Sequence, residues 1–477
     1  MEDHHLRVFV NGSFVAEGRW DGKNAHRVEA ELGVGILREG ENTLELESVS
    51  DTGAAYSMVM VDRCRIRYPR TTTVLERALH VIELTESSPR WVESRTGFEA
   101  RGTYVAVDED ELRRPERRSV VPSRLRKRRR AEYLVIGPET LVETAKPLIE
   151  HRRRQGLRTA TASTEAIASE FGHGELTPDA IKEFIGYAYH EWRAPRLRYV
   201  LLLGDATFDF KNYLGTDVTN QVPPFMVRTS YLWTASDPAY AAVNGDDLLP
   251  DVAIGRLPAK SSEELRVMVA KILAYETGEL SEEAPFVLVA DNADRAGNFE
   301  KDADELASTL LAGRETKRIY LSRLGTSAAR EAIVESFDRG ASTMSYLGHG
   351  SINLWADENL FNNARVETLS PQSQQPLLLT MNCLNGYFHF PYFDSLAEVL
   401  VKQEDKGAIA AFSPSGLSLN GPAHRYHQAL LQQLVSARHT RLGDAVLAAQ
   451  KLYADTGAFP ELLSIYHLFG DPALTLR

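Results

Sequence analysis

The sequence lacks the features that would place it in several large protein classes. It has only two cysteines, Cys64 and Cys383, in regions of different character, so we do not expect disulfide bonds to hold the fold together. No apolar run reaches the ~18 residues of a membrane-spanning helix. The first residues, MEDHHLRVFV, lack the charged and then apolar layout of a signal peptide. We therefore expect either a cytoplasmic protein or a fragment of a longer secreted one, and the sequence does not distinguish the two.

Charge and absent motifs exclude further functions. The net charge is −12 and the pI is about 5.6, whereas a general nucleic-acid-binding protein usually carries a basic surface. There is no Walker-type phosphate loop, no GxGxxG fingerprint and no G-x-S-x-G nucleophile elbow. What remains is an ordinary globular composition over 477 residues, long enough for about two or three domains.

The first part of the chain has the pattern of β structure. Leu6–Val10 has the pattern of a short strand and runs into Asn11-Gly12, a strong hairpin signal. Thr43–Glu47 alternates between polar and apolar residues. Short strands between turns predict a β-sandwich or jelly-roll-like module. A structural role is favoured for it, with carbohydrate or partner binding as the alternative. Cys64 lies between charged residues on an expected strand and is interpreted as a small buried apolar residue.

A strongly basic run follows. Every residue of Arg124–Arg130 except Leu125 is arginine or lysine. A solvated linker between domains is the first interpretation of such a run. The alternative is a processing site for a protease that cleaves after basic residues, including this protein itself.

From Tyr133 onward, strands alternate with helices, which predicts an α/β fold with a mostly parallel sheet flanked by helices. The predicted strands include Tyr133–Ile136, Tyr199–Leu203, Phe286–Ala290, Ala341–Leu347 and Leu377–Met381. The predicted domain order is a β module (1–70), a β extension and the start of the linker (71–125), an α/β subdomain (126–260) and a second α/β subdomain (261–477).

A histidine and a cysteine come directly after two of these strands. His349 stands between two glycines after Ala341–Leu347, and Cys383 follows Leu377–Met381. In open parallel sheets, ligands bind at the carboxyl ends of the strands. If the two strands are neighbours, the imidazole lies where it can take the proton of the thiol, which a nucleophilic cysteine requires. The backbone N–H groups of Gly350 and Cys383 are the candidate donors of an oxyanion hole.

Several motifs of the second half together resemble the gingipain-type cysteine peptidases, family C25 of clan CD, which have a caspase-like fold. The motifs are Tyr346-Leu347-Gly348-His349-Gly350-Ser351 with Trp355 shortly after, Asn382-Cys383-Leu384-Asn385-Gly386, Leu203-Gly204-Asp205, Ile254-Gly255-Arg256, and Phe469-Gly470-Asp471-Pro472-Ala473-Leu474. The resemblance spans roughly Tyr133 to Arg477. It implies Cys383 as nucleophile, His349 as general base and acid, and cleavage of peptide bonds through an acyl-enzyme.

The resemblance also implies two acidic residues at the site. One orients the histidine, and Asp294, or alternatively Asp291, is the candidate for this role. The other is the S1 anion that receives an arginine or lysine side chain, for which Glu300, or alternatively Asp302, is the candidate. Trp355 is a further candidate for substrate binding. Structurally, such acids could equally be ordinary residues near a helix N-terminus.

The sequence gives only weak indications of a metal site. Asp237, Asp246, Asp247 and Asp251 could supply oxygen ligands to a structural calcium ion, although clustered aspartates are often only solvated. His424 and His427 share a helix face, but no third ligand stands out, so a zinc site is not expected. No cofactor is expected to be required.

The sequence thus predicts a cysteine endopeptidase that cleaves protein or peptide substrates after Arg or Lys and has no nucleic-acid partner. One alternative is a sortase-type transpeptidase of the same family. Another is an inactive peptidase-like module whose β region binds a partner.

Overall fold

The structure is a computed structural model. It describes residues 2–22, 24–54, 57, 59, 61, 63–66, 80–84, 102–106, 123–278, 284–436 and 438–476. The chain divides into two compact units, Met1–Arg118 and Ser119–Arg477, and each is described by itself. Among the described residues, no helix is long and apolar enough to cross a membrane.

The N-terminal unit contains a small antiparallel sheet of order β2-β1-β3. The strands are β1 (His4–Val10), β2 (Ser13–Trp20) and β3 (Leu44–Ser48). Asn11 and Gly12 make the predicted turn between β1 and β2, and both have positive φ angles, as a tight hairpin requires. A separate hairpin pairs β4 (His80–Leu84) with β5 (Gly102–Ala106).

One expectation for this unit needs correction, and another stays a prediction. The described residues form one three-stranded sheet and one hairpin, which agrees with the predicted β structure, and the two facing sheets of a sandwich stay a prediction. Cys64 lies outside any strand and is exposed. Its charged neighbours at positions 63 and 65 are exposed as well, so the segment does not enter an apolar core.

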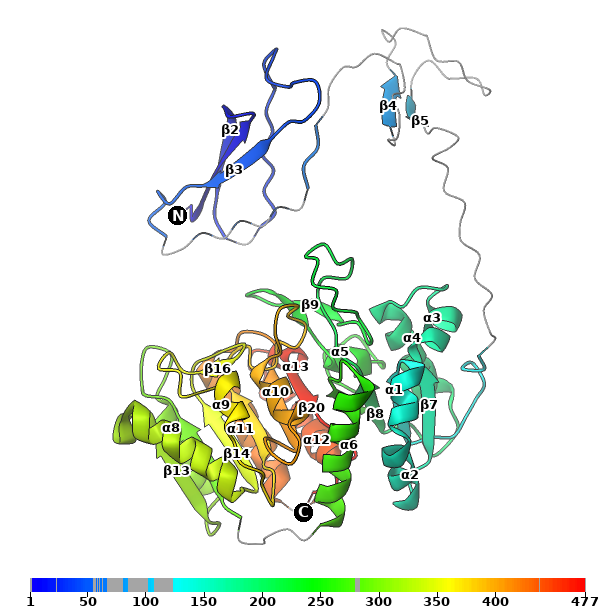
Figure 1. The fold of residues 1–477 in the computed structure, drawn as a ribbon, viewed down its shortest axis with the longest axis vertical. Coiled ribbons are helices and arrows are strands. Elements are labelled where there is room, and N and C mark those ends of the chain that lie inside the picture. The colour runs from blue at the N-terminus through cyan, green and yellow to red at the C-terminus, as the bar shows by residue number, and fades with distance from the viewer. Residues whose placement is uncertain are drawn as a thin grey trace. The chain divides into compact units, whose positions relative to one another are not determined.

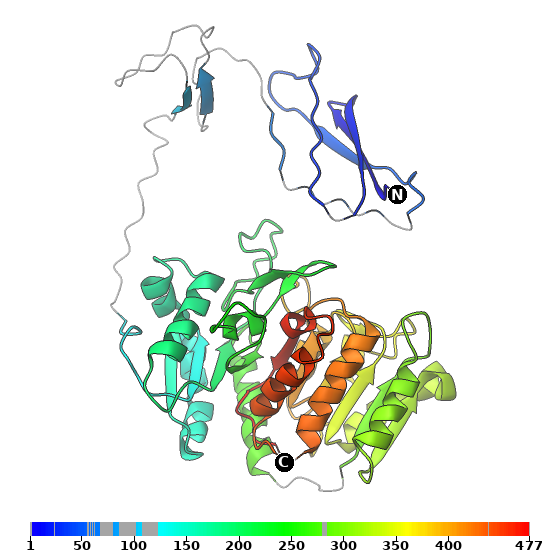
Figure 2. The same ribbon diagram turned by 180° about the vertical axis from the view of Figure 1, so that it is seen from behind.

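The second unit is built on one ten-stranded sheet with helices on both faces (Figures 1 and 2), which confirms the predicted fold class. Across the sheet the strands are β13 (Thr316–Tyr320), β12 (Phe286–Ala290), β14 (Thr343–Leu347), β18 (Leu377–Met381), β19 (Ala410–Pro414), β20 (Tyr466–Phe469), β11 (Ala253–Leu257), β8 (Tyr199–Leu203), β6 (Tyr133–Gly137) and β7 (Thr159–Ser163). Every neighbouring pair is parallel except β19 and β20.

Strand β20 joins two parallel halves of this sheet. It is parallel to β11 and antiparallel to β19, so the strands of the two halves run in opposite directions. The segment before residue 260 supplies one half, and the segment after it supplies the other half together with β20. The division into subdomains at residue 260 stays a prediction, and it falls between β11 and the next helix.

The helices cover both faces of the sheet. Those in front in Figure 1 are α1 (Glu139–Thr144), α2 (Lys146–Arg154), α6 (Ser262–Thr277), α8 (Leu321–Arg339), α9 (Asn363–Glu367) and α10 (Leu396–Lys402). The opposite face carries α7 (Phe299–Thr309), α11 (Asn420–Val435) and α12 (Leu442–Ala454), and α11 packs against both α7 and α12. The remaining helices are α3 (Thr164–Phe171), α4 (Pro178–Glu191), α5 (Pro238–Ala241) and α13 (Leu462–Ile465).

Some loops of this unit contain short strands that do not belong to the ten-stranded sheet. A hairpin pairs β9 (Met226–Arg228) with β10 (Trp233–Ala235). A three-stranded ribbon of β15 (Gly350–Ser351), β16 (Leu354–Trp355) and β17 (Phe361–Asn362) follows directly after β14. This ribbon includes the residue after His349, so it helps to fix the backbone on which the imidazole is carried.

The basic run is attached to the second unit. The backbone N–H groups of Leu125 and Arg126 both donate to the Glu170 carboxylate at 3.0 Å. Arg128 pairs with Glu191 at 2.6 Å. Leu125 is buried, while most of the basic side chains are exposed. The run is therefore solvated, as predicted, but it is anchored on α3 and α4 rather than free along its length.

Candidate active site

The two strands that precede His349 and Cys383 are neighbours in the sheet. Strand β14 pairs in parallel with β18, and Leu347 lies opposite Met381. The loops that carry the histidine and the cysteine therefore leave the same edge of the sheet from adjacent strands. The structure thus confirms that the two strands are neighbours, which is the condition that the sequence analysis set for this pair of residues.

The two loops also touch. A Cβ atom added to Gly350 would lie 2.2 Å from Asn382 Nδ2 and 2.9 Å from the Cys383 carbonyl oxygen, much closer than ordinary contact. Only glycine leaves room for this approach. The requirement for glycine beside His349 is thus a direct consequence of the cysteine loop packing against it.

The backbone of His349 is held from both sides. Its N–H donates to Asp291 Oδ2 at 3.1 Å, and its carbonyl accepts from the Tyr346 hydroxyl at 2.7 Å and the Ala356 N–H at 2.9 Å. Burial raises the pKa of Asp291. Asp291 was the alternative candidate for orienting the imidazole, and the structure shows it bonded to the histidine backbone instead.

The imidazole itself is paired with Asp294. His349 Nε2 lies 2.9 Å from Asp294 Oδ2, and the two side chains are 43% and 42% exposed. This hydrogen bond lowers the pKa of Asp294, so the carboxylate stays ionised through the neutral range. The edge-to-face ring of Phe299, 5.4 Å away, packs on the imidazole. Asp294 is the acid that can fix the tautomer and orientation of His349.

Cys383 sits in a tight turn held by asparagines. Asn382 Nδ2 donates to Asn385 Oδ1 at 2.5 Å, and Asn385 Nδ2 donates to the carbonyl of Ser351 at 2.5 Å and to that of Leu354 at 3.2 Å. Both asparagine side chains are buried. The bonds of Asn385 tie the cysteine turn to the ribbon that follows His349, a role that the sequence analysis did not assign to it.

The backbone of this turn is strained next to the thiol. Leu384 has φ of +62°, a left-handed conformation that costs a non-glycine residue about 1–2 kcal/mol. Its N–H donates to the Gly416 carbonyl at 3.1 Å. Such strain persists only where surrounding contacts enforce it, and it is common at functional sites.

The thiol faces Ser418, which precedes α11. The Ser418 N–H lies 3.4 Å from Cys383 Sγ, and the Ser418 hydroxyl donates to the Asn382 carbonyl at 2.8 Å. Burial raises the pKa of the Cys383 thiol, against the opposing effect of the Ser418 N–H. The resting cysteine is therefore a thiol that needs a base. Ser418 is a site residue that sequence reasoning missed, because it lies on a strand-to-helix loop with no motif around it.

Two predicted substrate-binding residues have other tasks. Trp355 is fully buried and stacks on Tyr346 with ring centroids 4.5 Å apart, so it supports the histidine strand and does not line an open surface. The Glu300 carboxylate accepts from the Ser322 N–H at 3.0 Å and from the Ser322 hydroxyl at 2.7 Å. Glu300 thus accepts hydrogen bonds from the first turn of α8, and its carboxylate is not free to act as the S1 anion.

The alternative S1 anion, Asp302, points to the other side of α7. Its Oδ2 accepts from Asn420 Nδ2 at 2.8 Å. Asn420 begins α11, directly after the loop whose Ser418 contacts the thiol. A Cβ added to Gly297, in the loop that carries Asp294, would lie 2.2 Å from the same Asn420 amide. Asp302 therefore lies near the loop of Asp294, which contacts His349, and near the loop of Ser418, which contacts Cys383.

The predicted calcium ligands do not come together. Asp237 is buried in an ion pair whose two carboxylate oxygens accept from Arg256 at 2.8 and 2.7 Å. Although burial opposes the charge, Arg256 holds the pKa of Asp237 well below its usual range. Asp251 accepts from two backbone N–H groups. Among the described residues, Asp246 and Asp247 belong to no cluster of metal-ligand type. The arginine occupies the position that a cation would need.

This ion pair supports the cysteine loop. The Arg256 guanidinium lies 4.5 Å from the ring centre of Phe388, which follows the cysteine turn, and Arg256 also donates to the carbonyls of Gly204 and Val222. His467 lies 3.5 Å from Asp237. The Ile254-Gly255-Arg256 and Phe469-Gly470 motifs therefore act as structure beneath the site.

Comparison with known proteins identifies the family. The family model described as Peptidase family C25 matches residues 126–477. The chain belongs to peptidase family C25. It is 25% identical over 366 residues to gingipain R2 of Porphyromonas gingivalis strain W83, which covers 72% of this chain and 46% of that protein. It is 24% identical over 289 residues to Lys-gingipain W83 of the same species, which covers 59% of this chain and 15% of the relative.

Solved structures agree with the fold. The crystal structure of the Arg-specific cysteine proteinase gingipain R aligns with a TM-score of 0.61 at 23% identity, covering 75% of this chain and 80% of that one. The complex of the pro- and mature domains of RgpB from Porphyromonas gingivalis aligns with a TM-score of 0.62 at 23% identity, covering 72% and 80%. C25 membership implies a cysteine-type endopeptidase and therefore protein substrates. The chain spans less than half the length of gingipain R2.

Proposed function

We propose that this C25 member hydrolyses peptide bonds with Cys383 as nucleophile and His349 as general base and acid. The observation that carries the proposal is the contact of the two loops at the ends of β14 and β18, with Gly350 packed against Asn382 and Cys383. The hydrogen bond of His349 to Asp294 supports it further. Each side chain has the chemistry that its proposed role needs.

The proposed reaction begins with a protonated thiol. His349 takes the proton of Cys383, and the sulfur attacks the carbonyl carbon of the scissile bond. His349 then donates that proton to the leaving amine, which departs and leaves an acyl-enzyme. Water, deprotonated by His349, hydrolyses the thioester and restores the thiol. Asp294 stabilises the imidazolium that forms in each half of the cycle.

The N–H of Gly350 is suited to the predicted oxyanion hole. Gly350 lies opposite Trp355 in the β15–β16 ladder, and the neighbouring bond runs from the Ala356 N–H to the His349 carbonyl. This register makes Gly350 and Trp355 a pair without mutual hydrogen bonds, so the ladder does not use the Gly350 N–H. We propose that it and the Cys383 N–H stabilise the tetrahedral oxyanion.

For substrate preference, we propose that Asp302 receives an arginine or lysine side chain at P1. Glu300 is committed to α8, whereas Asp302 lies next to Asn420 at the thiol side of the site. A carboxylate there would pair with a guanidinium or ammonium group. The names of the relatives, Arg-specific and Lys-gingipain, support a basic P1 residue.

The two cysteines allow a matched test. We expect Cys383→Ala to abolish turnover of Arg- and Lys-ended peptide reporters, because the nucleophile is removed, and Cys64→Ala to retain it, because Cys64 is exposed in the other unit. Wild-type turnover by Cys383→Ala would show that the nucleophile is misassigned. Adding an amine nucleophile and measuring ligated product separates hydrolysis from transpeptidation. Failure of an arginine chloromethylketone to modify Cys383 would favour the inactive binding module.

Self-processing near Arg124–Arg130 is a further proposal, based on the basic run at the boundary between the units. Because the run is bonded to Glu170 and Glu191, cleavage requires it to detach from α3 and α4. N-terminal sequencing after prolonged incubation should show new ends within the run for the wild type and not for Cys383→Ala. An intact N-terminus in active enzyme would refute the proposal.

A further inference from the structure

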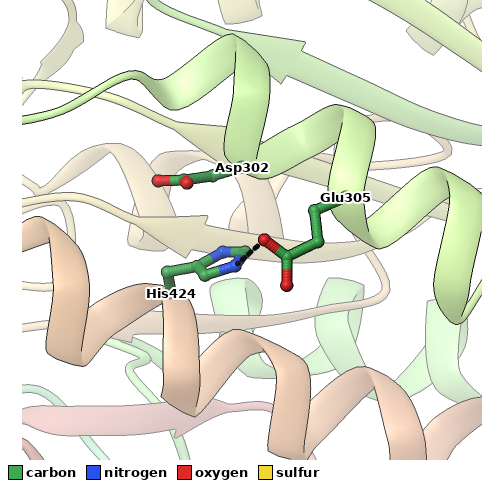
Figure 3. A group of neighbouring side chains, drawn as sticks. All are labelled: Asp302, Glu305 and His424. Atoms are coloured by element: carbon green, nitrogen blue, oxygen red, sulfur yellow. Dashed lines mark ion pairs between the residues drawn. The ribbon is translucent and has the colours of Figure 1, made fainter.

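Helices α7 and α11 bring three side chains of metal-ligand type together. Asp302 and Glu305 project from α7, and His424 projects toward them from α11 (Figure 3). Each offers a ligand atom, and these three atoms lie within 4.8 Å of one another. The spacing of three residues between Asp302 and Glu305 places both carboxylates on one face of α7. The third ligand that the sequence analysis could not find for His424 thus comes from another helix.

Within the described part of the chain, the His424 side chain has no hydrogen-bond partner. Its side chain is only 11% exposed, and both ring nitrogens are buried without a hydrogen bond. Its nearest charged group is Glu305 Oε2, 3.6 Å from Nε2. Buried imidazole nitrogens are normally satisfied. A buried imidazole that forms no hydrogen bond and is aimed at two carboxylates is the arrangement that a cation would complete.

The two carboxylates are oriented by neutral amides. Asp302 Oδ2 accepts from Asn420 Nδ2, and Glu305 Oε1 accepts from Gln428 Nε2, both at 2.8 Å. The second oxygen of each carboxylate is left for another partner. Among the described residues, neither carboxylate forms an ion pair with a lysine or an arginine. Hydrogen-bonded ligating carboxylates are typical of metal sites, where such bonds fix the ligands.

A second acidic cluster in the same unit differs from the cluster of α7 and α11 in its charged neighbours. Asp205, Asp394 and Glu398 also lie within ligand distance of one another. Lys402 Nζ lies 2.7 Å from Asp394 and 3.5 Å from Glu398, and Lys260 lies 3.7 Å from Asp205. Ammonium groups thus neutralise that cluster. Of the residues that the structure describes, no lysine or arginine fills the cluster of α7 and α11.

We propose that Asp302, Glu305 and His424 form a binding site for a divalent transition-metal ion of the zinc type. Imidazole favours such ions over calcium or magnesium. Three protein ligands with a water at the fourth position match an open zinc site. The ion would join α7 to α11, the helices that follow the Asp294 loop and the Ser418 loop. The site shares Asp302 with the proposed S1 pocket, so a bound ion would occupy the carboxylate that a basic P1 residue needs.

Metal binding can be tested without relying on catalysis. The parent protein for this test is the Cys383→Ala variant, in which the Cys383 thiol cannot act as a metal ligand. Its affinity for Zn²⁺ is measured by isothermal titration calorimetry. In that background we expect His424→Gln and Glu305→Gln each to weaken Zn²⁺ binding at least about tenfold, because one of three protein ligands is lost. Asp304→Asn is the control, since it removes a carboxylate of the same helix that bonds Tyr320 instead.

The outcomes are distinct. Loss of affinity in both cluster variants, with the control unchanged, supports the site. Equal Zn²⁺ affinity in the parent and in both cluster variants overturns it, as does the absence of measurable binding to the parent. Circular dichroism of each variant checks folding. A second measurement, the rise in Tm on adding Zn²⁺, should appear in the parent and the control and disappear in His424→Gln.

Discussion

The sharpest structural prediction concerns Gly350, where the histidine and cysteine loops meet. In Gly350→Ala, the new methyl group would lie 2.2 Å from Asn382 Nδ2 and 2.9 Å from the Cys383 carbonyl. Asn382 cannot swing away cheaply, because it is buried and donates to Asn385. The two loops must therefore separate by roughly 1 Å to restore ordinary contact, and displacements of that size at a catalytic pair cost on the order of 10²-fold in rate.

The same clash has an energetic consequence. An extra methyl group in a packed site lowers the free energy of unfolding by about 1–3 kcal/mol. We expect kcat/KM on an Arg-ended reporter to fall about 10²-fold in Gly350→Ala, with a lower Tm by calorimetry. Alkylation of Cys383 by an arginine chloromethylketone should slow in parallel, because the histidine loop is pushed away from the cysteine loop.

Gly186 provides the matched control. It lies inside α4, and an added Cβ would be 3.8 Å from Val243, an ordinary contact. Gly186→Ala should leave kcat/KM unchanged and stabilise the protein by about 0.5–1 kcal/mol through helix propensity. Unchanged kcat/KM and Tm in Gly350→Ala would refute the packing of the two loops, whatever the behaviour of Gly186→Ala.

Further predictions concern the charged groups around the site. Asp294→Asn should lower kcat about 10–10²-fold, less than for a fully buried acid because Asp294 is 42% exposed. Since His349 lowers the pKa of Asp294, the ratio of wild-type to Asp294→Asn kcat should hold until the pH falls below about 4. Asp302→Asn should reduce kcat/KM for Arg- and Lys-ended reporters about 10²-fold, and equal loss on reporters without a basic P1 residue would contradict an S1 role. Arg256→Met should lower the free energy of unfolding by about 3–5 kcal/mol because it leaves Asp237 buried without its arginine. In that variant we expect burial to raise the folded-state pKa of Asp237 above its unfolded value. The loss of stability, measured by urea unfolding, should then shrink as the pH falls, and a loss independent of pH would count against this explanation.

The sequence was sufficient for the strands that carry the site. Leu377–Met381 and Phe286–Ala290 are predicted with the bounds that the structure has, because they are short apolar runs that end in polar or glycine-containing turns. The proposed dyad rests on β14 and β18, which are neighbouring parallel strands and therefore end at the same edge of the sheet. A break that apolar periodicity alone does not show separates α1 from α2 at Ala145, because Pro147 in the first turn of α2 cannot donate a hydrogen bond.

What the sequence could not supply is the packing of helices distant along the chain. The sequence does not show whether Glu300 or Asp302 is the better candidate for the S1 anion. Only the positions of Ser322 and Asn420 show which of the two carboxylates is already used in a structural contact. His424 looked isolated because its partners lie on α7 and not on its own helix. Trp355 follows the histidine motif closely, yet its stacking on Tyr346 buries it.

In the proposed mechanism, the Cys383 thiol and the His349 imidazole act on one peptide bond. Intact-protein and tandem mass spectrometry of enzyme quenched milliseconds after mixing with an Arg-ended ester tests this mechanism. We expect an acyl group on Cys383 in the wild type and none in His349→Ala. Hydrolysis of the ester with no acyl group on Cys383, or equal acylation without the histidine, would contradict it.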